Sequence, residues 1–293
     1  MHCKSNNPKK FLPMLCRILV SEALQKLESL WHYSAPNMAS FEEIPPYDFT
    51  VLADEGLPCF EDRDVKEMLL QWNLDQTMSI SRFRFVGSFD QNSDADNDRL
   101  LKDFLRDASC GAKLGFIGTP EVPTAVELQQ LSTGVMSMNF FDRLEEADIT
   151  RNGMIKGCFE EIYDGISVAD KLRDMLANDD SENACLYTEK EKLELIFVLF
   201  RLLVLGGSMA QPDTKIERYS ELTKAMYKEL LTVFKNPASG EVSVAGRCFR
   251  IQKVAGLELF EDPDKDKQNL LVAIVDPLKK VVTTLKVNYK SFW

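Results

Sequence analysis

One continuous apolar segment near residue 200 constrains the fold of this chain more than any other feature. It reads LELIFVLFRLLVL over residues 193–205 and contains two charged residues, Glu194 and Arg201. The segment is shorter than the roughly 18 apolar residues that a membrane span needs. Because it is apolar on most of its sides, we expect it to form a helix at the centre of a hydrophobic core.

Capping signals flank this segment on both sides. Thr188 and Glu191 have the S/T-x-x-E spacing of a capping box, which satisfies free backbone N–H groups of the first helical turn. Gly206 and Gly207 follow the last apolar residue and favour termination of the helix there. The sequence therefore predicts one helix over residues 188–207.

The first third of the chain alternates between the hydrophobic periods of strands and of helices. Strands are expected over residues 47–53, 79–87 and 114–118, where apolar side chains alternate or form a short run. Helices are expected between them, within residues 61–74 and 97–107, because apolar residues recur there at helical spacing. The predicted order of elements is β-α-β-α-β.

The middle of the chain is predicted to be mostly helical. We expect Ser167 to cap a helix over residues 167–179. Residues 213–234 are expected to form a long amphipathic helix with Phe234 on its apolar face.

The last fifth changes to the period of strands. The cluster NPASGE at residues 236–241 predicts a turn, and residues 242–254 after it alternate as a strand does. Residues 269–289 predict two strands joined by a turn at Asp276–Pro277.

Together these patterns predict an α+β fold. We expect a single domain over residues 46–293, in which C-terminal antiparallel strands pack on the central helices. Its parts are a β/α part at residues 46–128, a helical part at 129–235 and a β part at 236–293. Residues 1–45 are expected to be a disordered or partly amphipathic extension, and Met38 offers an alternative start of translation.

Charge and cysteine usage argue against two classes of function. The net charge of −11 argues against nucleic-acid binding, because phosphate contacts need a clustered cationic face. The seven cysteines are odd in number and widely spaced, without a CxxC pair, which argues against a zinc ribbon or a redox dithiol. We expect reduced thiols in a cytosolic protein.

Histidine is nearly missing from the sequence. The chain has only His2 and His32, both before Met38. This excludes Ser-His-Asp and Cys-His catalysis, and HExxH zinc sites, from the rest of the chain. The sequence also has no GxxxxGK[ST] loop and no GxGxxG after a strand. We therefore predict no catalytic residue, no cofactor, no metal site and no enzymatic activity.

Two acidic runs imitate calcium-binding loops. They read DADND at residues 94–98 and DPDKD at residues 262–266. Arg99 and Lys267 stand where such a loop needs its glycine. Both runs are predicted to be solvated loops, and the first also favours the N-terminus of the helix that follows it.

The stretch QQLSTGVMSMNFFDRLEEADI at residues 129–149 allows a catalytic loop, a partner-binding surface or ordinary core. The scarcity of histidine disfavours catalysis, and we expect a glycine-containing turn or strand end that enters an amphipathic helix. If the segment is a helix, Phe140 and Phe141 cannot both face one core, because neighbouring residues of a helix point about 100° apart. A partner-binding surface and two faces of a buried helix both remain open; the candidate partner-binding residues are Met136, Met138, Phe140 and Phe141.

Several segments resemble those of one known family, the cilia- and flagella-associated protein 300 family. The segments are LSTGVMSMNFFDRLEEADI, LFRLLVLGGSMAQPD, YSELTKAMYKELLTVFKNPASGEVSVAGRCFRI and AIVDPLKK, with YDFTVLADEGLP, LLQWNL and RFRFVGSFDQ upstream. The resemblance is collinear from about Tyr47 to about Tyr289. One element departs from the family's pattern, since its FRFLP is FTVLADEGLP here.

The resemblance implies a non-enzymatic assembly or adaptor factor for outer and inner axonemal dynein arms, needed for the motility of cilia and flagella. It implies a cytoplasmic protein that also reaches the cilium and its axoneme with intraflagellar transport. The implied partners are other dynein-arm assembly factors and axonemal dynein chains, with no nucleic acid and no membrane. The family supplies no catalytic residues.

Two other functions remain as alternatives. A small-molecule-binding or degenerate enzyme fold predicts a deep pocket where several of Asp90, Gln91, Ser208 and Gln211 converge. A structural component of the axoneme predicts salt-resistant retention in demembranated flagella.

Overall fold

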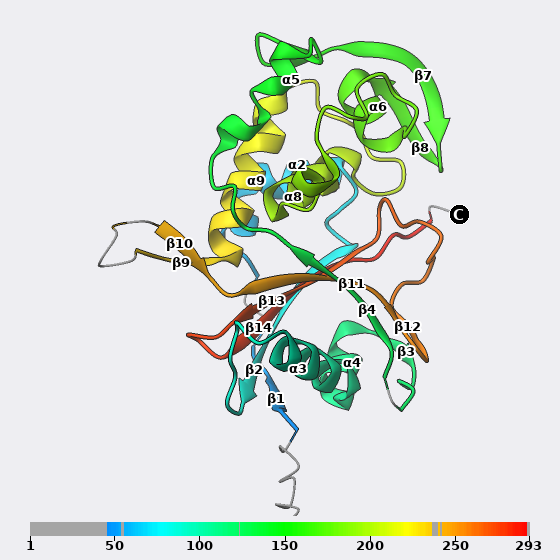
Figure 1. The fold of residues 1–293 in the computed structure, drawn as a ribbon. Helices are drawn as coiled ribbons and strands as arrows, with labels where there is room; N and C mark the ends of the chain where they lie inside the picture. The colour runs from blue at the N-terminus through cyan, green and yellow to red at the C-terminus, as the bar shows by residue number, and fades with distance from the viewer. Residues whose placement is uncertain (1–45, 54–55, 123, 236–239, 241, 292–293) are drawn as a thin grey trace, which may run out of the picture. The chain divides into compact units, whose positions relative to one another are not determined.

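An antiparallel sheet runs through the part of the chain that the computed structural model describes (Figure 1). The described residues are 46–53, 56–122, 124–235, 240 and 242–291, all within the compact unit Pro46–Trp293. The predicted extension at residues 1–45, and all of the predicted turn at 236–241 except Gly240, lie outside them.

The sheet contains strands from both ends of the described unit, and β2 (Met78–Val86) pairs directly with β14 (Val281–Val287). Among the described residues the sheet has eight strands: in order β1 (Asp48–Val51), β2 (Met78–Val86), β14 (Val281–Val287), β13 (Leu270–Asp276), β11 (Arg247–Val254), β12 (Leu257–Glu258) and β3 (Ile117–Gly118), with β4 (Val126–Leu131) also paired to β11. All of these pairings are antiparallel. Strands from the first third and the last fifth of the chain therefore share one sheet.

Both faces of this sheet are buried, as strand β13 shows. Leu270, Val272 and Ile274 belong to one hydrophobic core. Leu271, Ala273 and Val275, which alternate with them, belong to a second core. A strand that is covered on both faces is apolar at every position, and this explains the run LLVAIV.

Helices cover the two faces separately (Figure 1). On one face lie α3 (Asp94–Arg106) and α4 (Ala108–Leu114), whose apolar residues contribute to the second core. The solvated loop predicted at residues 94–98 is wrong: these residues begin α3, where Ser93 caps the helix and the acidic side chains lie in its first turn. The larger core on the other face contains residues of α2 (Arg63–Gln71), α6 (Lys171–Ala177), α8 (Leu195–Leu205) and α9 (Ile216–Leu230). The predicted mixture of helices and antiparallel strands, an α+β fold, is confirmed.

The apolar segment forms the central helix, but the helix predicted over residues 188–207 is interrupted. The capping box of Thr188 and Glu191 is present and begins a short helix, α7 (Glu189–Lys192). Helix α8 starts only at Leu195, because the backbone of Ser132 inserts between them. Ser132 N donates to Leu193 O at 2.9 Å, and Leu195 N donates to Ser132 O at 2.8 Å. A residue from a distant loop thus takes the hydrogen bonds that would have continued the helix.

The predicted helix cap at Ser167 is wrong. Ser167 lies in strand β8 (Ile166–Asp170), and Asp170 caps α6 by accepting a 2.8 Å hydrogen bond from Arg173 N. Strand β8 pairs with β7 (Gly157–Tyr163), and β5 (Thr150–Arg151) pairs with β6 (Met154–Ile155). Both hairpins turn at dipeptides with positive φ, Asn152–Gly153 and Asp164–Gly165, which is the typical hairpin signal in a sequence.

Two other boundaries differ from the predictions. Helix α9 ends at Leu230, so Phe234 lies in strand β9 (Thr232–Lys235) and is exposed instead of facing a core. Strand β9 pairs with β10 (Val242–Ala245). The strand expected over residues 114–118 is reduced to β3, because α4 extends to Leu114 and ends at the left-handed Gly115.

The turn after α8 lies in close contact with the end of α2. Gly206 has φ +63° and ψ −167°, and Gly207 N donates to Trp72 O at 2.9 Å. A Cβ atom added to Gly207 would lie 2.2 Å from the carbonyl oxygen of Asn73. Only glycine fits here without moving a backbone.

We expect Gly207→Ala to lower the free energy of unfolding by about 1–3 kcal/mol, because the added methyl group forces two backbones apart. Urea denaturation monitored by circular dichroism measures this. Gly111→Ala in α4 is the matched control: its Cβ would meet only Phe116, at 3.9 Å, so we expect no loss of stability. An equal loss in both variants would contradict the close-contact explanation.

Candidate functional site

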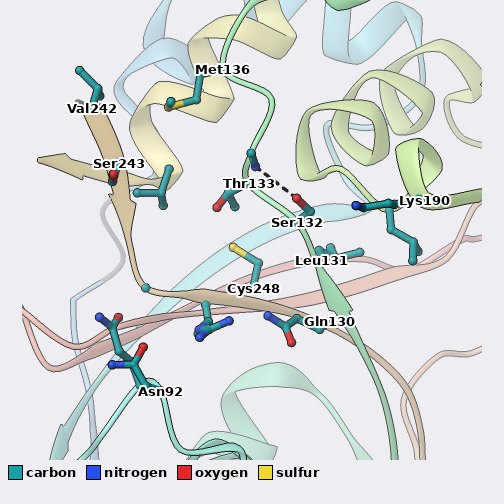
Figure 2. Close-up of a pocket in the computed structure, with 16 residues that line it drawn as sticks. Asn92, Gln130, Leu131, Ser132, Thr133, Met136, Lys190, Val242, Ser243 and Cys248 are labelled. Atoms are coloured by element: carbon teal, nitrogen blue, oxygen red, sulfur yellow. Dashed lines mark hydrogen bonds between the residues drawn. The ribbon is translucent and has the colours of Figure 1, made fainter. Parts of the chain in front are cut away.

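A groove lies between the loop that follows β4 and the hairpin of β9 and β10 (Figure 2). Its volume is about 710 Å³. We call it the hairpin groove; the residues that line it are Gln91, Asn92, Gln130–Gly134, Met136, Lys190, Leu193, Val242–Val244 and Gly246–Cys248. The charged residues among them are Lys190 and Arg247, so the described lining is cationic in a chain whose net charge is −11.

The buried carboxylate of Glu194 holds the loop on one side of this groove. Ser132 Oγ donates to Glu194 Oε1 at 2.6 Å, and Val135 N donates to Glu194 Oε2 at 3.1 Å. Gly134 N donates to Ser132 Oγ at 3.2 Å, the contact that Figure 2 marks with a dashed line. Glu194 is 8% exposed, so these hydrogen bonds supply the partners that a buried charge requires.

Helix α9 supplies a further contact to the same loop. Tyr227 Oη donates to Thr133 O at 3.2 Å. Burial of Tyr227 raises the pKa of its hydroxyl group, which therefore stays protonated and able to donate. The loop is thus held both from the α7–α8 junction and from α9.

Neither Ser132 nor Cys248 of the groove is an activated nucleophile. The Ser132 hydroxyl donates to Glu194 and accepts from Gly134, and a carboxylate is a weak base for a serine hydroxyl. Burial raises the pKa of Cys248 to about 12, so this thiol is protonated at neutral pH and is not nucleophilic. The arrangement orders a loop; it does not activate Ser132 or Cys248.

The four residues predicted to bind a partner lie at different depths. Met136 is 47% exposed and lines the hairpin groove, and it also lines a neighbouring cavity of about 280 Å³ together with Met138. Met138 and Phe140 are half-buried and pack against the larger core, and Phe141 is buried in it. Of the four, Met136 is thus the residue most accessible to a partner.

Phe140 and Phe141 both pack on aromatic residues of the same core. They lie in the 3₁₀ helix η2 (Met138–Phe141), which precedes α5 (Arg143–Glu146). The ring centroid of Phe141 is 4.3 Å from that of Phe200, and the ring centroid of Phe140 is 5.0 Å from that of Tyr187. The expected turn into a helix is present, but the helical part is short and differs from the expected amphipathic helix. The expectation that Phe140 and Phe141 cannot both face one core is wrong, because they lie in a single 3₁₀ turn and both pack against the larger core.

Sequence reasoning missed the hairpin on the other side of the groove. Val233, Phe234 and Val242 are large exposed apolar residues of β9 and β10. The signal that could have identified them is the turn cluster NPASGE between two short apolar runs, which is typical of a hairpin.

The residues that the ligand-binding alternative expects in one pocket are divided between two cavities in the described part of the chain. Gln91 lines the hairpin groove, whereas Ser208 and Gln211 line a separate cavity of about 680 Å³ beside Gln71 and Asn73. Two of the four residues thus share a cavity, Gln91 lies in another, and Asp90 lines neither of the two.

The described ranges contain neither a cluster of metal ligands nor a helix that could span a membrane. No group of three or more histidine, cysteine or carboxylate side chains there is arranged to hold a metal ion. None of the helices in these ranges is long and apolar enough to cross a membrane. The cysteines within the described residues have free thiols: Cys59, Cys110, Cys158, Cys185 and Cys248.

Comparison with known proteins gives one consistent result. A family model described as "Cilia- and flagella-associated protein 300" matches residues 46–287. A protein of that name from Chlamydomonas reinhardtii is 32% identical over 248 residues, which cover 79% of this chain and 94% of the relative. One from Paramecium tetraurelia is 28% identical over 235 residues, which cover 80% of this chain and 90% of the relative. No solved structure matches the chain.

Proposed function

Because the chain belongs to the cilia- and flagella-associated protein 300 family, we propose that it serves cilia and flagella as a non-enzymatic adaptor in the assembly or transport of outer and inner axonemal dynein arms. The observation that carries this proposal is the family match, which spans nearly all of the described unit. The protein acts in the cytoplasm and reaches the axoneme with its cargo.

The chemistry of the hairpin groove supports a binding role over a catalytic one. Ser132 is hydrogen-bonded to Glu194 and Gly134, and Cys248 is a buried thiol of raised pKa. The sequence supplies no histidine after His32 as a general base.

The groove is the docking surface in this proposal. Met136 and Val242 expose apolar surface on its two sides, and Lys190 and Arg247 supply positive charge. Within the described residues, β10 has β9 as its one partner strand, which leaves its other edge available for pairing. An extended segment with apolar and acidic side chains, from an assembly factor or a dynein chain, matches these features.

Replacing Met136 and Val242 together by serine tests this surface. We expect the recovery of dynein-arm assembly factors and dynein chains, by proximity labelling in a ciliated cell, to fall at least about tenfold, as loss of interface anchors does. Both side chains are about half exposed, at 47% and 49%, so the free energy of unfolding should change by less than about 1 kcal/mol.

Leu278→Ser is the matched control, since Leu278 is an exposed apolar residue outside the groove. Its recovery of partners should equal that of the wild type. If the wild-type protein recovers no dynein chain and no assembly factor, the adaptor function is wrong. If the double variant recovers as much as the control, the function stands and the choice of surface is wrong.

Cell fractionation separates the adaptor from a structural axonemal component. An assembly or transport factor should be found mainly in the cytoplasmic fraction and be released from detergent-extracted axonemes by salt. Retention in axonemes at high salt would favour the structural role.

A further inference from the structure

A second cavity, distinct from the hairpin groove, lies between α8 and the sheet. Its volume is about 270 Å³, and Arg201 of α8 and Arg250 of β11 both line it. We call it the arginine pocket; its polar and charged lining residues are Gln129, Asp179, Glu189, Lys192, Arg201, Arg250, Lys267 and Asn269.

The fold brings these two arginines together from distant parts of the chain. Arg201 is the second charge of the apolar segment, and it follows the fully buried Phe200. Arg250 is two residues from Cys248 along β11, so it shares the sheet face that carries the larger core. It stands opposite Gln129 of β4, which lines the same pocket.

Neither guanidinium has a carboxylate partner within the described part of the chain. Arg201 makes no hydrogen bond or ion pair there, and Arg250 donates only to the main-chain oxygen of Asp266, at 3.1 Å. The lysines differ in this respect. Lys267 Nζ lies 3.2 Å from Asp179 Oδ2 and 3.3 Å from Asp164 Oδ2, and Lys192 Nζ lies 2.8 Å from Glu189 Oε1. The unpaired charge in the pocket is therefore that of the two arginines.

Keeping these charges partly buried is costly. Burial lowers the pKa of Arg201, and the neighbouring charge of Arg250 lowers it further. Burial also lowers the pKa of Arg250. Arginine stays protonated in proteins, so two like charges share a cavity that also has apolar walls such as Phe197 and Leu202. The carboxylate of Asp266 raises the pKa of both arginines, and that of Asp179 raises the pKa of Arg201, but among the described residues no carboxylate forms an ion pair with either guanidinium.

We propose that the arginine pocket binds an oxyanion, a phosphate or carboxylate group, between the guanidinium groups of Arg201 and Arg250. The planar fork of N–H donors on each guanidinium matches the paired oxygens of such groups. The bound anion supplies the missing counter-charge, and the apolar walls strengthen the attraction by excluding water. This inference does not depend on the adaptor role.

Titration with inorganic phosphate at constant ionic strength tests the proposal. Thermal unfolding and ³¹P NMR should show saturable binding to the wild-type protein, with a higher midpoint of unfolding. In R201Q and R250Q the affinity should fall at least tenfold. R151Q is the control, because Arg151 is an exposed arginine paired with Asp148 outside the pocket, and it should bind phosphate as the wild type does.

The stability of the same variants without phosphate separates a binding role from a structural one. Removing an unpaired, partly buried charge should leave the midpoint of unfolding unchanged or raise it. If either arginine instead had a structural role, its replacement by glutamine would lower the midpoint of unfolding. If a glutamine variant fails to fold, R201K and R250K replace it. These variants keep the positive charge but lose the paired N–H donors of the guanidinium group, so they should also bind phosphate more weakly than the wild type.

Two blocked tripeptides distinguish the sources of the anion. Competition by acetyl-Ala-Glu-Ala-amide, but not by its glutamine analogue, would assign the pocket to an acidic side chain of a partner. Binding of phosphate alone would assign it to a small free anion. No saturable binding of either probe, or equal binding by R201Q and R250Q, would overturn the proposal.

Discussion

Replacing Phe141 with alanine is expected to lower the free energy of unfolding by about 3–5 kcal/mol. The phenyl ring is 6% exposed and packs against Phe200 of the central helix, with ring centroids 4.3 Å apart. The substitution removes the ring and leaves a cavity beside α8, which the surrounding core can fill only in part. Urea denaturation of the purified protein measures the loss.

Phe159→Ala is the matched control for the loss of a phenyl ring. Phe159 lies in β7 and is 93% exposed, so its replacement should change the free energy of unfolding by less than about 0.5 kcal/mol. A Phe141→Ala protein that keeps its stability but loses a partner would reverse the assignment, and Phe141 would then be a surface residue.

Glu194→Ala is expected to lower the free energy of unfolding by about 2–4 kcal/mol and to release the loop beside the hairpin groove. The carboxylate accepts from Ser132 Oγ and from Val135 N, and hydrogen bonds to charged groups contribute about 1.5–3 kcal/mol each. Part of this loss is offset, because a buried charge is removed as well.

Hydrogen exchange gives a local measurement for the same variant. The amide of Val135 donates to Glu194, and the amide of Gly134 donates to Ser132, whose hydroxyl is oriented by Glu194. Both amides should exchange faster in Glu194→Ala. Recovery of partners should fall too, since this loop forms one side of the groove.

Two further variants control for this result. Glu194→Gln keeps the shape and one acceptor oxygen, so it should lose less stability than Glu194→Ala. Glu189→Ala removes an exposed glutamate that pairs with Lys192, and such pairs contribute less than about 1 kcal/mol. Unchanged exchange at Val135 in Glu194→Ala would show that Glu194 does not hold the loop.

Local signals in the sequence predicted the elements whose stability is local. The capping box at Thr188 and Glu191, the strands on both sides of Asp276–Pro277 and the apolar segment at residues 193–205 are where their patterns indicate. The hairpins at Asn152–Gly153 and Asp164–Gly165 also had a local signal, but the surrounding residues were assigned to helices.

The candidate site was predicted only in part. The stretch at residues 129–149 was identified, and Met136 within it lines the hairpin groove. The opposite side comes from β9 and β10, whose pairing ends α9 earlier than its periodicity predicts. Periodicity along one segment carries no information about which distant strand will pair with it.

The sequence by itself determined that a buried helix lies at the centre of the fold, that catalysis by histidine is excluded after residue 32, and that the chain resembles one family. It also placed two charges, Glu194 and Arg201, in the apolar segment, without showing why a core would hold them. Only the tertiary structure decided their surroundings. Ser132, which is 62 residues from Glu194 in sequence, interrupts the helix and binds the carboxylate, and the sheet brings Arg250 beside Arg201. Burying a charge depends on the groups that surround it in space, and the folding of the whole chain brings those groups together.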